Sequence, residues 1–170
     1  MAKAQGLTVS ESEISQTFDL DKIAGAKISS DPALRNQIAQ AIVDYMIGRV
    51  QLDNLGIDRK PWKAKSYSKS YVNSQDFEAA GKSEDSVDLT LSGDMLGSVD
   101  ITKQSKGLVT ISITDKSALP RAYGHMTGFE GHPTIPPNKY KREFFGVSDK
   151  EIKDQVLQFF SDEINALSGE

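Results

Sequence analysis

Apolar residues recur at helical spacing between residue 31 and about residue 52, where Asp31 can cap a helix and Pro32 occupies its first position. The apolar stripe comprises Leu34, Ile38, Ile42, Tyr45 and Arg49, and it is widened by Ala39, Val43, Met46 and Val50. A helix that is apolar over so much of its circumference is usually buried on more than one side. We therefore expect it to pack on a sheet and on another helix or subunit, and to stop at Gly56 and Pro61.

A second helix is predicted near the C-terminal end of the sequence. Ser148 and Glu151 have the spacing of a capping box, Asp149 suits the first turn, and Val147 with Ile152 has the spacing of a hydrophobic staple. The helical spacing continues through Ile152, Val156, Phe159, Phe160 and Ile164 as far as Ser168 and Gly169. Loss of the Ser148 cap is expected to cost about 1 kcal/mol. Residues 10–26 give a weaker helical signal, and Phe18 and Leu20 fit a short strand equally well.

Between these helices the apolar period changes from that of a helix to that of a strand. Three runs alternate in this way: Val87, Leu89 and Leu91; Val99 and Ile101; and Val109, Ile111 and Ile113. The short polar segment at residues 104–107 predicts an antiparallel hairpin between the last two runs. The expected fold is a single α+β domain over residues 1–170, with an antiparallel sheet of about four strands packed against two or three helices.

Two long segments, at residues 57–86 and 118–141, are predicted to be extended loops. The first holds the only tryptophan, Trp62, and loops of such length are usually functional or disordered. The second contains four prolines and three glycines, so we expect an extended arm that turns repeatedly.

Composition narrows the function classes. The chain of 170 residues has no cysteine, which excludes disulfides, thiol nucleophiles and cysteine-based metal sites. No apolar run is long enough to span a bilayer and residues 1–16 lack a signal-peptide pattern, so we expect a protein made and used in a cytoplasm-like compartment. The net charge of −4 argues against broad nucleic-acid binding. Locally, Arg59, Lys60, Lys63, Lys65 and Lys69 surround Trp62, Tyr67 and Tyr71. This basic and aromatic segment is either a solvated loop or a contact for nucleic acid or an acidic protein surface.

The motifs that suggest chemistry are incomplete. Gly81, Lys82 and Ser83 end like a phosphate-binding loop, but Asp76 stands where that loop needs its first glycine. Ser66 and Lys69 have the spacing of a serine–lysine pair without its partner motifs. The two histidines, His125 and His132, lack a carboxylate pattern that would complete a metal site, and solvation explains Asp19, Asp21 and Asp94. We therefore expect no catalytic residue, cofactor or metal, and a protein that is not an enzyme.

Three stretches of the second half of the chain resemble the phage virion-morphogenesis or tail-completion family, which is related to tail-terminator and head–tail joining proteins. Residues 87–98 (VDLTLSGDMLGS) are similar to that family's strand, glycine and leucine-containing turn, and residues 122–128 (AYGHMTG) to its Tyr-Ala-x-x-His-x-x-Gly pattern. Residues 141–149 (KREFFGVSD) resemble its Arg-Pro-Phe-Leu-Gly-Leu-Ser motif, which an acidic residue and the last helix follow. Glu143 departs from the motif's proline and Phe145 from its leucine.

The resemblance implies a structural protein of the virion, assembled in the host cytoplasm, that completes or terminates the tail and helps to join it to the head. It further implies a ring, with six copies expected, that contacts neck or connector proteins and tail-tube or sheath proteins, and that lines a DNA channel at most passively. The candidate interface residues are Trp62, Tyr67, Tyr71, Tyr123, His125, Phe129, Arg142, Phe144 and Phe145. For Phe144 and Phe145 the alternative is that they close the core under the last helix. Two other functions stay open, a binding module of another contractile or secretion machine and a small hydrolase that uses His125 with a carboxylate.

Overall fold

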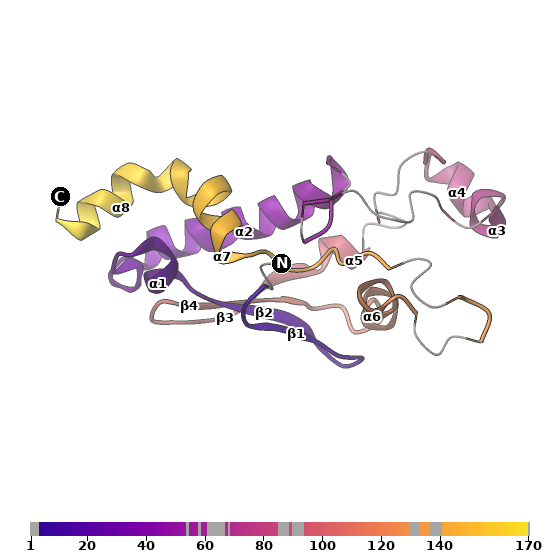
Figure 1. The fold of residues 1–170 in the computed structure, drawn as a ribbon, viewed down its shortest axis with the longest axis horizontal. Coiled ribbons are helices and arrows are strands. Elements are labelled where there is room, and N and C mark those ends of the chain that lie inside the picture. Colours follow the sequence, from indigo (N-terminus) through magenta and orange to yellow (C-terminus); the bar gives the residue numbers. More distant parts are fainter. Residues whose placement is uncertain are drawn as a thin grey trace.

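The computed structural model describes residues 4–53, 55–57, 59–60, 67, 69–84, 89, 94–129, 133–136 and 141–169. Its centre is a four-stranded antiparallel sheet in the order β1-β2-β4-β3, which confirms the α+β class (Figure 1). The strands are β1 (Leu7–Val9), β2 (Ile14–Asp19), β3 (Val99–Ser105) and β4 (Leu108–Ile113). The helical elements of the first hundred residues are α1 (Leu20–Ala24), η1 (Ile28–Ser30), α2 (Pro32–Gln51), α3 (Lys69–Val72), α4 (Gln75–Ala79) and α5 (Asp94–Gly97). Those of the remainder are α6 (Leu119–Thr127), α7 (Asp149–Glu151), η2 (Ile152–Val156), η3 (Leu157–Phe160) and α8 (Ser161–Ser168).

The long helix α2 forms where the apolar pattern predicts it. Asp31 Oδ1 accepts hydrogen bonds from the backbone N–H groups of Ala33 and Leu34, both at 3.0 Å, so the cap is as expected. The helix contacts strand β3 on one side and η2 on another, and both layers are visible above the sheet in Figure 1. The prediction that α2 is buried on more than one side is therefore confirmed.

The predicted hairpin between β3 and β4 is also confirmed, with a tighter turn than expected. Ser105 pairs with Leu108, so only Lys106 and Gly107 lie in the turn, and Gln104 and Ser105 belong to the strand. Gly107 has a steric role, because a Cβ atom at this position would lie 2.7 Å from Cγ of Asp21. The side chains of Val109, Ile111 and Ile113 face the core, as the alternating pattern predicts.

Residues 10–26 form both of the structures that the sequence left open. Strand β2 carries Phe18 into the core, and α1 begins at Leu20 immediately after it. Asp19 caps α1 by accepting from the N–H of Lys22 at 3.1 Å. Strand β1 was not expected, because three residues are too few to show an alternation. The predicted strand at residues 87–91 lies outside the described residues apart from Leu89, which is buried and belongs to no strand.

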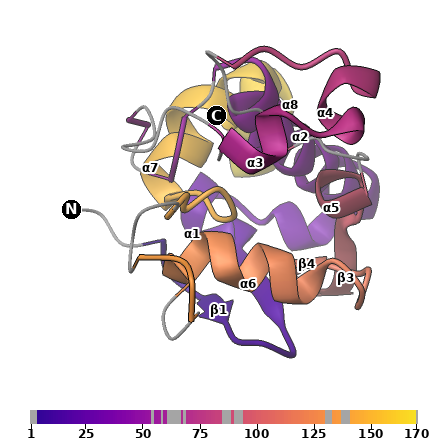
Figure 2. The same cartoon turned by 90° about the vertical axis from the view of Figure 1, so that its right-hand side faces the viewer.

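The two predicted loops contain helices. Segment 57–86 includes α3 and α4, which lie on the side of α2, whereas α6 lies at the end of the sheet (Figures 1 and 2). The prediction of an extended arm at residues 118–141 is wrong for residues 119–127, which form α6. Pro120 sits in the first turn of that helix, where no N–H is needed, and Gly128 ends the helix with a φ of +85°. Pro120 and Gly128, two of the residues that suggested an arm, thus begin and end a helix.

The C-terminal helical segment begins with the predicted capping box but is not one regular helix. It passes from α7 into a π-helical turn, η2, and then through the 3₁₀ turn η3 into α8. A π turn places one more residue in each hydrogen-bonded ring than an α turn, so it shifts the phase of the apolar stripe. Ile152, Val156 and Ile164 are buried as expected, whereas Phe159 is 75% exposed, so its place on the buried stripe was predicted wrongly.

Candidate functional site

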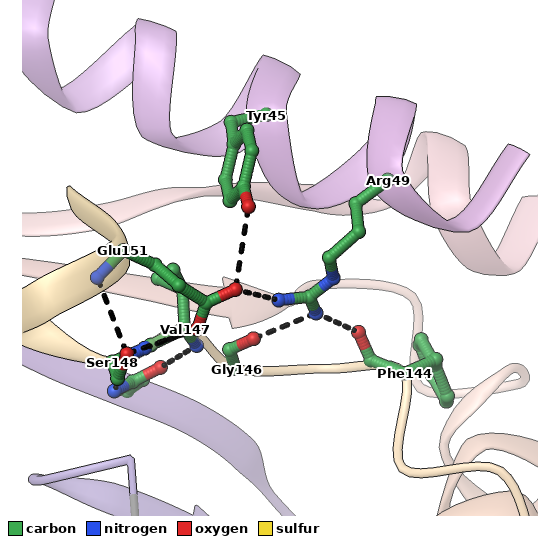
Figure 3. Close-up of polar contacts among 8 residues, drawn as sticks. Tyr45, Arg49, Phe144, Gly146, Val147, Ser148 and Glu151 are labelled. Carbon is green, nitrogen blue, oxygen red and sulfur yellow. Dashed lines mark hydrogen bonds and ion pairs between the residues drawn. The ribbon is translucent and has the colours of Figure 1, made fainter. Parts of the chain in front are cut away.

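Residues 141–148, which we call the strap, lead into the C-terminal helical segment and contain most of the motif at residues 141–149 that resembles the phage family. Arg49 reaches the strap from the last turns of α2 (Figure 3). Its Nη2 atom donates to the carbonyl oxygens of Phe144 at 2.9 Å and Gly146 at 2.8 Å, and its Nη1 atom lies 3.3 Å from Oε1 of Glu151. The Arg49 side chain is 1% exposed, so one buried cation joins α2, the strap and α7.

Glu151 is the counter-charge and also belongs to the helix cap. Its Oε2 atom accepts from the backbone N–H and from the hydroxyl of Ser148, both at 3.0 Å, and the Ser148 hydroxyl accepts from the Glu151 N–H at 3.2 Å. The Tyr45 hydroxyl donates to Oε1 of Glu151 at 3.3 Å. Burial lowers the pKa of Arg49, and the charge of Glu151 opposes that shift. Burial, followed by the charge of Glu151, raises the pKa of Tyr45.

The other side of the strap is held by a buried amide. Gln16 of β2 is fully buried, its Nε2 atom donates to the carbonyl oxygens of Gln5 and Val147, and its Oε1 atom accepts from the Val147 N–H at 2.9 Å. The Gln16 side chain thus makes hydrogen bonds with both the N–H and the carbonyl of Val147, as a paired residue of a neighbouring strand would. Gly146, next to Val147, has a φ of +118°, a conformation that a residue with a side chain rarely adopts. The strap is therefore fixed from α2 and from β2 at adjacent residues.

The start of the strap packs on α6, where three of the candidate interface residues meet. The Arg142 N–H donates to the His125 carbonyl at 2.7 Å, and Arg142 Nη1 lies 3.4 Å from His125 Nδ1. The rings of His125 and Phe129 meet edge to face with centroids 5.2 Å apart. Gly124 makes room for that ring, because a Cβ atom there would lie 2.3 Å from Cε1 of Phe129. Tyr123 is half-buried against the core.

Two further candidates, Tyr67 just before α3 and Tyr71 in α3, form a small aromatic cluster with Phe77 of α4. Tyr67, Tyr71 and Phe77 contact one another edge to face, with ring centroids 5.2 to 5.4 Å apart. Lys82 donates to the Tyr67 hydroxyl at 3.3 Å, and its Nζ atom lies 5.4 Å from the centroid of that ring. Trp62 lies outside the described residues. The cluster and the α6 group occupy different sides of the molecule (Figure 2).

Three of the candidate interface residues are buried inside this chain. Phe144 and Phe145 are each 1% exposed and belong to the hydrophobic core, and Arg142 is 3% exposed. This burial is what the core-closing alternative predicts for the two phenylalanines, and a role of these three residues at an interface stays a prediction. Arg49 was placed on the buried stripe by its spacing, but its partner Glu151 was assigned only to the helix cap. The bridging role of Gln16 had no sequence signal, because an isolated glutamine in a strand looks like any surface residue.

Several residues of the incomplete chemical motifs make structural contacts in the described part of the chain. Lys82 contacts the aromatic cluster, Asp19 caps α1, and Asp21 accepts from the N–H and hydroxyl of Ser29. Ser66 and His132 lie outside the described residues. Within the part of the chain that the structure describes, no three His, Cys, Asp or Glu side chains are close enough to hold a metal ion, and no helix combines the length and the apolar character that a membrane span requires.

Comparison with known proteins adds no relative. No protein-family model, curated protein or solved structure matches this chain.

Proposed function

We propose that this chain is a structural virion protein of a tailed phage, a neck or tail-terminator subunit that completes the tail and helps to join it to the head. The proposal includes a ring of identical subunits, six copies by analogy with the resembled family, that contacts a connector protein on one side and tail-tube or sheath proteins on the other. It places the protein in the virion after assembly in the host cytoplasm.

The observation that supports the proposal is the placement of the motif at residues 142–149. Each position that matches the family pattern has a distinct structural task. Arg142 binds α6, Phe144 and Gly146 present their carbonyls to Arg49, Ser148 caps the last helix, and Asp149 lies in its first turn. These residues together route the strap through the core.

The departure from the motif at Glu143 falls where the structure tolerates it. Its side chain is exposed and pairs with Lys141 at 3.4 Å, and its carbonyl accepts from the N–H of Ile57 at 2.8 Å. A proline keeps the carbonyl but removes the backbone N–H and the exposed ion pair, and such an ion pair is worth little. Phe145, which replaces the family's leucine, is a fully buried apolar residue, so the character of that position is kept.

Deletion of the gene from the phage or prophage genome that carries it tests the proposal. Electron microscopy of the lysate should show DNA-filled heads and separate tails, many of them of abnormal length, and the wild-type gene supplied from a plasmid should restore joined particles. Virions of normal form and number from the deletion strain would reject the proposed role. A variant with Arg121→Met, an exposed residue of α6, serves as the matched control because it should complement fully.

A further inference from the structure

The C-terminal helical segment contains two sets of apolar residues that differ in helical phase. The first set, which we call stripe A, has the spacing i, i+4, i+7 and comprises Ile152, Val156 and Phe159. The second set, which we call stripe B, has the spacing i, i+3, i+7, i+10 and comprises Leu157, Phe160, Ile164 and Leu167. An unbroken α-helix would place the centre of stripe B about 100° around its axis from the centre of stripe A. Such a helix cannot turn both stripes toward the same surface.

The π turn η2 lies where the chain passes from stripe A to stripe B. The N–H of Leu157 donates to the carbonyl of Ile152, five residues earlier, instead of the four residues that an α-helix would have. Beyond this turn stripe B takes over the buried side, with Leu157 8% and Ile164 9% exposed. Phe159, the last residue of stripe A, is left 75% exposed. The extra residue in the turn thus buries stripe B at the expense of Phe159.

The part of the segment beyond the π turn is loosely held. In α8, whose residues are all described, Ile164 is the only buried residue, and Leu167 is half-buried. The start of the segment is fixed instead, because the capping box holds α7 and η2 packs on α1 and α2. In Figure 1, α8 leads away from that fixed start toward the C-terminus. Elements that bury few apolar side chains open at a lower free-energy cost than the core, so α8 can move while Ile152 stays in place.

We infer that residues 153–168 have a second register, a regular α-helix without the π turn, and that η2 is the switch between the two registers. In the second register Phe159 lies within about 20° of Ile152 around the helix axis and turns toward the body of the protein. Leu157 and Ile164 turn outward at the same time and offer a second apolar stripe. A molecule that binds only this register shifts the equilibrium toward it. The inference does not depend on the proposed role in the phage tail.

The chain has no cysteine, so two introduced cysteines can carry spin labels on the full chain. Gln37→Cys and Asn165→Cys place the labels at exposed positions of α2 and α8. Double electron–electron resonance measures the distance between them. The wild-type background should show one major distance and a second population of about 5–10%. Leu157→Gln removes an apolar residue that only the observed register buries, so it should raise the ratio of the second population to the major one by about tenfold or more.

Two further backgrounds should lose the second population. Phe159→Gln removes the residue that only the second register buries, at a position that is exposed in the observed structure. Deletion of Gln155 removes the extra residue of the turn, so that a regular α-helix then keeps stripe B on the buried side. Both variants should fold and should retain the major distance alone. A label pair at Gln37→Cys and Lys103→Cys, which lie outside the segment, should give one unchanged distance in every background.

Three results would each overturn the inference. The first is a single distance in the wild-type background, and the second is a Leu157→Gln variant that is folded by far-UV circular dichroism and keeps the wild-type populations. The third is a second distance that persists after deletion of Gln155, because that population would then arise without a change of register. If Leu157→Gln does not fold, Leu157→Ala makes a milder change with the same expected direction, and unchanged populations in that variant would reject the switch.

Discussion

Arg49→Met is the substitution that most directly tests how the strap is held. Methionine has a side chain of similar length that can fill the same buried space. It lacks the donors to the Phe144 and Gly146 carbonyls and the positive charge beside Glu151. Loss of one partner of a buried ion pair costs about 3–5 kcal/mol, and a buried carbonyl without a donor costs about 1–3 kcal/mol. These contributions overlap because the freed strap can relax, so we expect a loss of about 4 kcal/mol in the free energy of unfolding. That is a large part of the roughly 5–15 kcal/mol typical of a folded domain.

Urea unfolding followed by far-UV circular dichroism measures this loss. Arg121→Met makes the same chemical change at an exposed position of α6 and should stay within about 0.5 kcal/mol of the wild type. Ser148→Ala removes the helix cap while Arg49 remains in place and should cost about 1 kcal/mol. The ordering of the three variants, with Arg49→Met far the largest, separates the strap contact from the cap and from a general arginine effect.

A double-mutant cycle with Glu151→Gln gives the sharper criterion. Because Arg49 and Glu151 are in contact, the loss in the double variant should be smaller than the sum of the single losses by about 2 kcal/mol. A loss of less than about 1 kcal/mol for Arg49→Met would refute the proposed role of Arg49 in holding the strap, since removal of a buried guanidinium with three acceptors should cost more. Additive losses would show that the ion pair adds nothing to the hydrogen bonds on the strap.

Two further predictions concern α6 and Tyr45. Gly124→Ala should destabilise the chain by about 1–2 kcal/mol because the new Cβ displaces the Phe129 ring. In a chain that also carries Phe129→Ala, the alanine at position 124 should stabilise the fold through its higher helix propensity. Urea unfolding measures both effects, and an equal loss of stability with and without the Phe129 ring would contradict the proposed clash. The raised pKa of Tyr45 means that the folded chain keeps the phenol proton when the unfolded chain loses it, so this stabilisation is complete below the ordinary value of 10.0 and declines as the pH rises above it. The Tyr45→Phe variant should therefore lose less stability than the wild type when the pH is raised from neutral to above 10.0. Urea unfolding of both proteins at the two pH values measures this difference. Equal losses in the two proteins would contradict a raised pKa of Tyr45.

Local signals were sufficient for the elements whose residues specify them from nearby in the chain. Asp31 and Pro32 begin α2, the alternation of Val109, Ile111 and Ile113 gives β4, and Ser148 with Glu151 caps α7. In each case the hydrogen-bonding partner or the repeat lies within a few residues, so the pattern in the sequence contains the whole cause. The α+β class followed from the change of period between these segments.

Other features depended on contacts that no local pattern contains. Proline and glycine predicted an arm at residues 118–141, yet Gly124 lies in the middle of α6 because the ring of Phe129 covers it. The exposure of Phe159 depends on a π turn that shifts the helical phase, which a regular spacing cannot anticipate. Burial of Phe144 and Phe145 was undecided, because an aromatic pair before a glycine suits both a core and an interface.

By itself the sequence determined the helix α2, the β3–β4 hairpin and the capped start of the last helical segment, because each is stabilised by neighbours in the chain. Only the tertiary structure decided what Arg49 and Gln16 do, since their partners at Phe144, Gly146 and Val147 are 95, 97 and 131 residues away along the chain. A buried cation or amide is tolerated only where acceptors and donors converge on it, and that convergence exists only once the chain is folded.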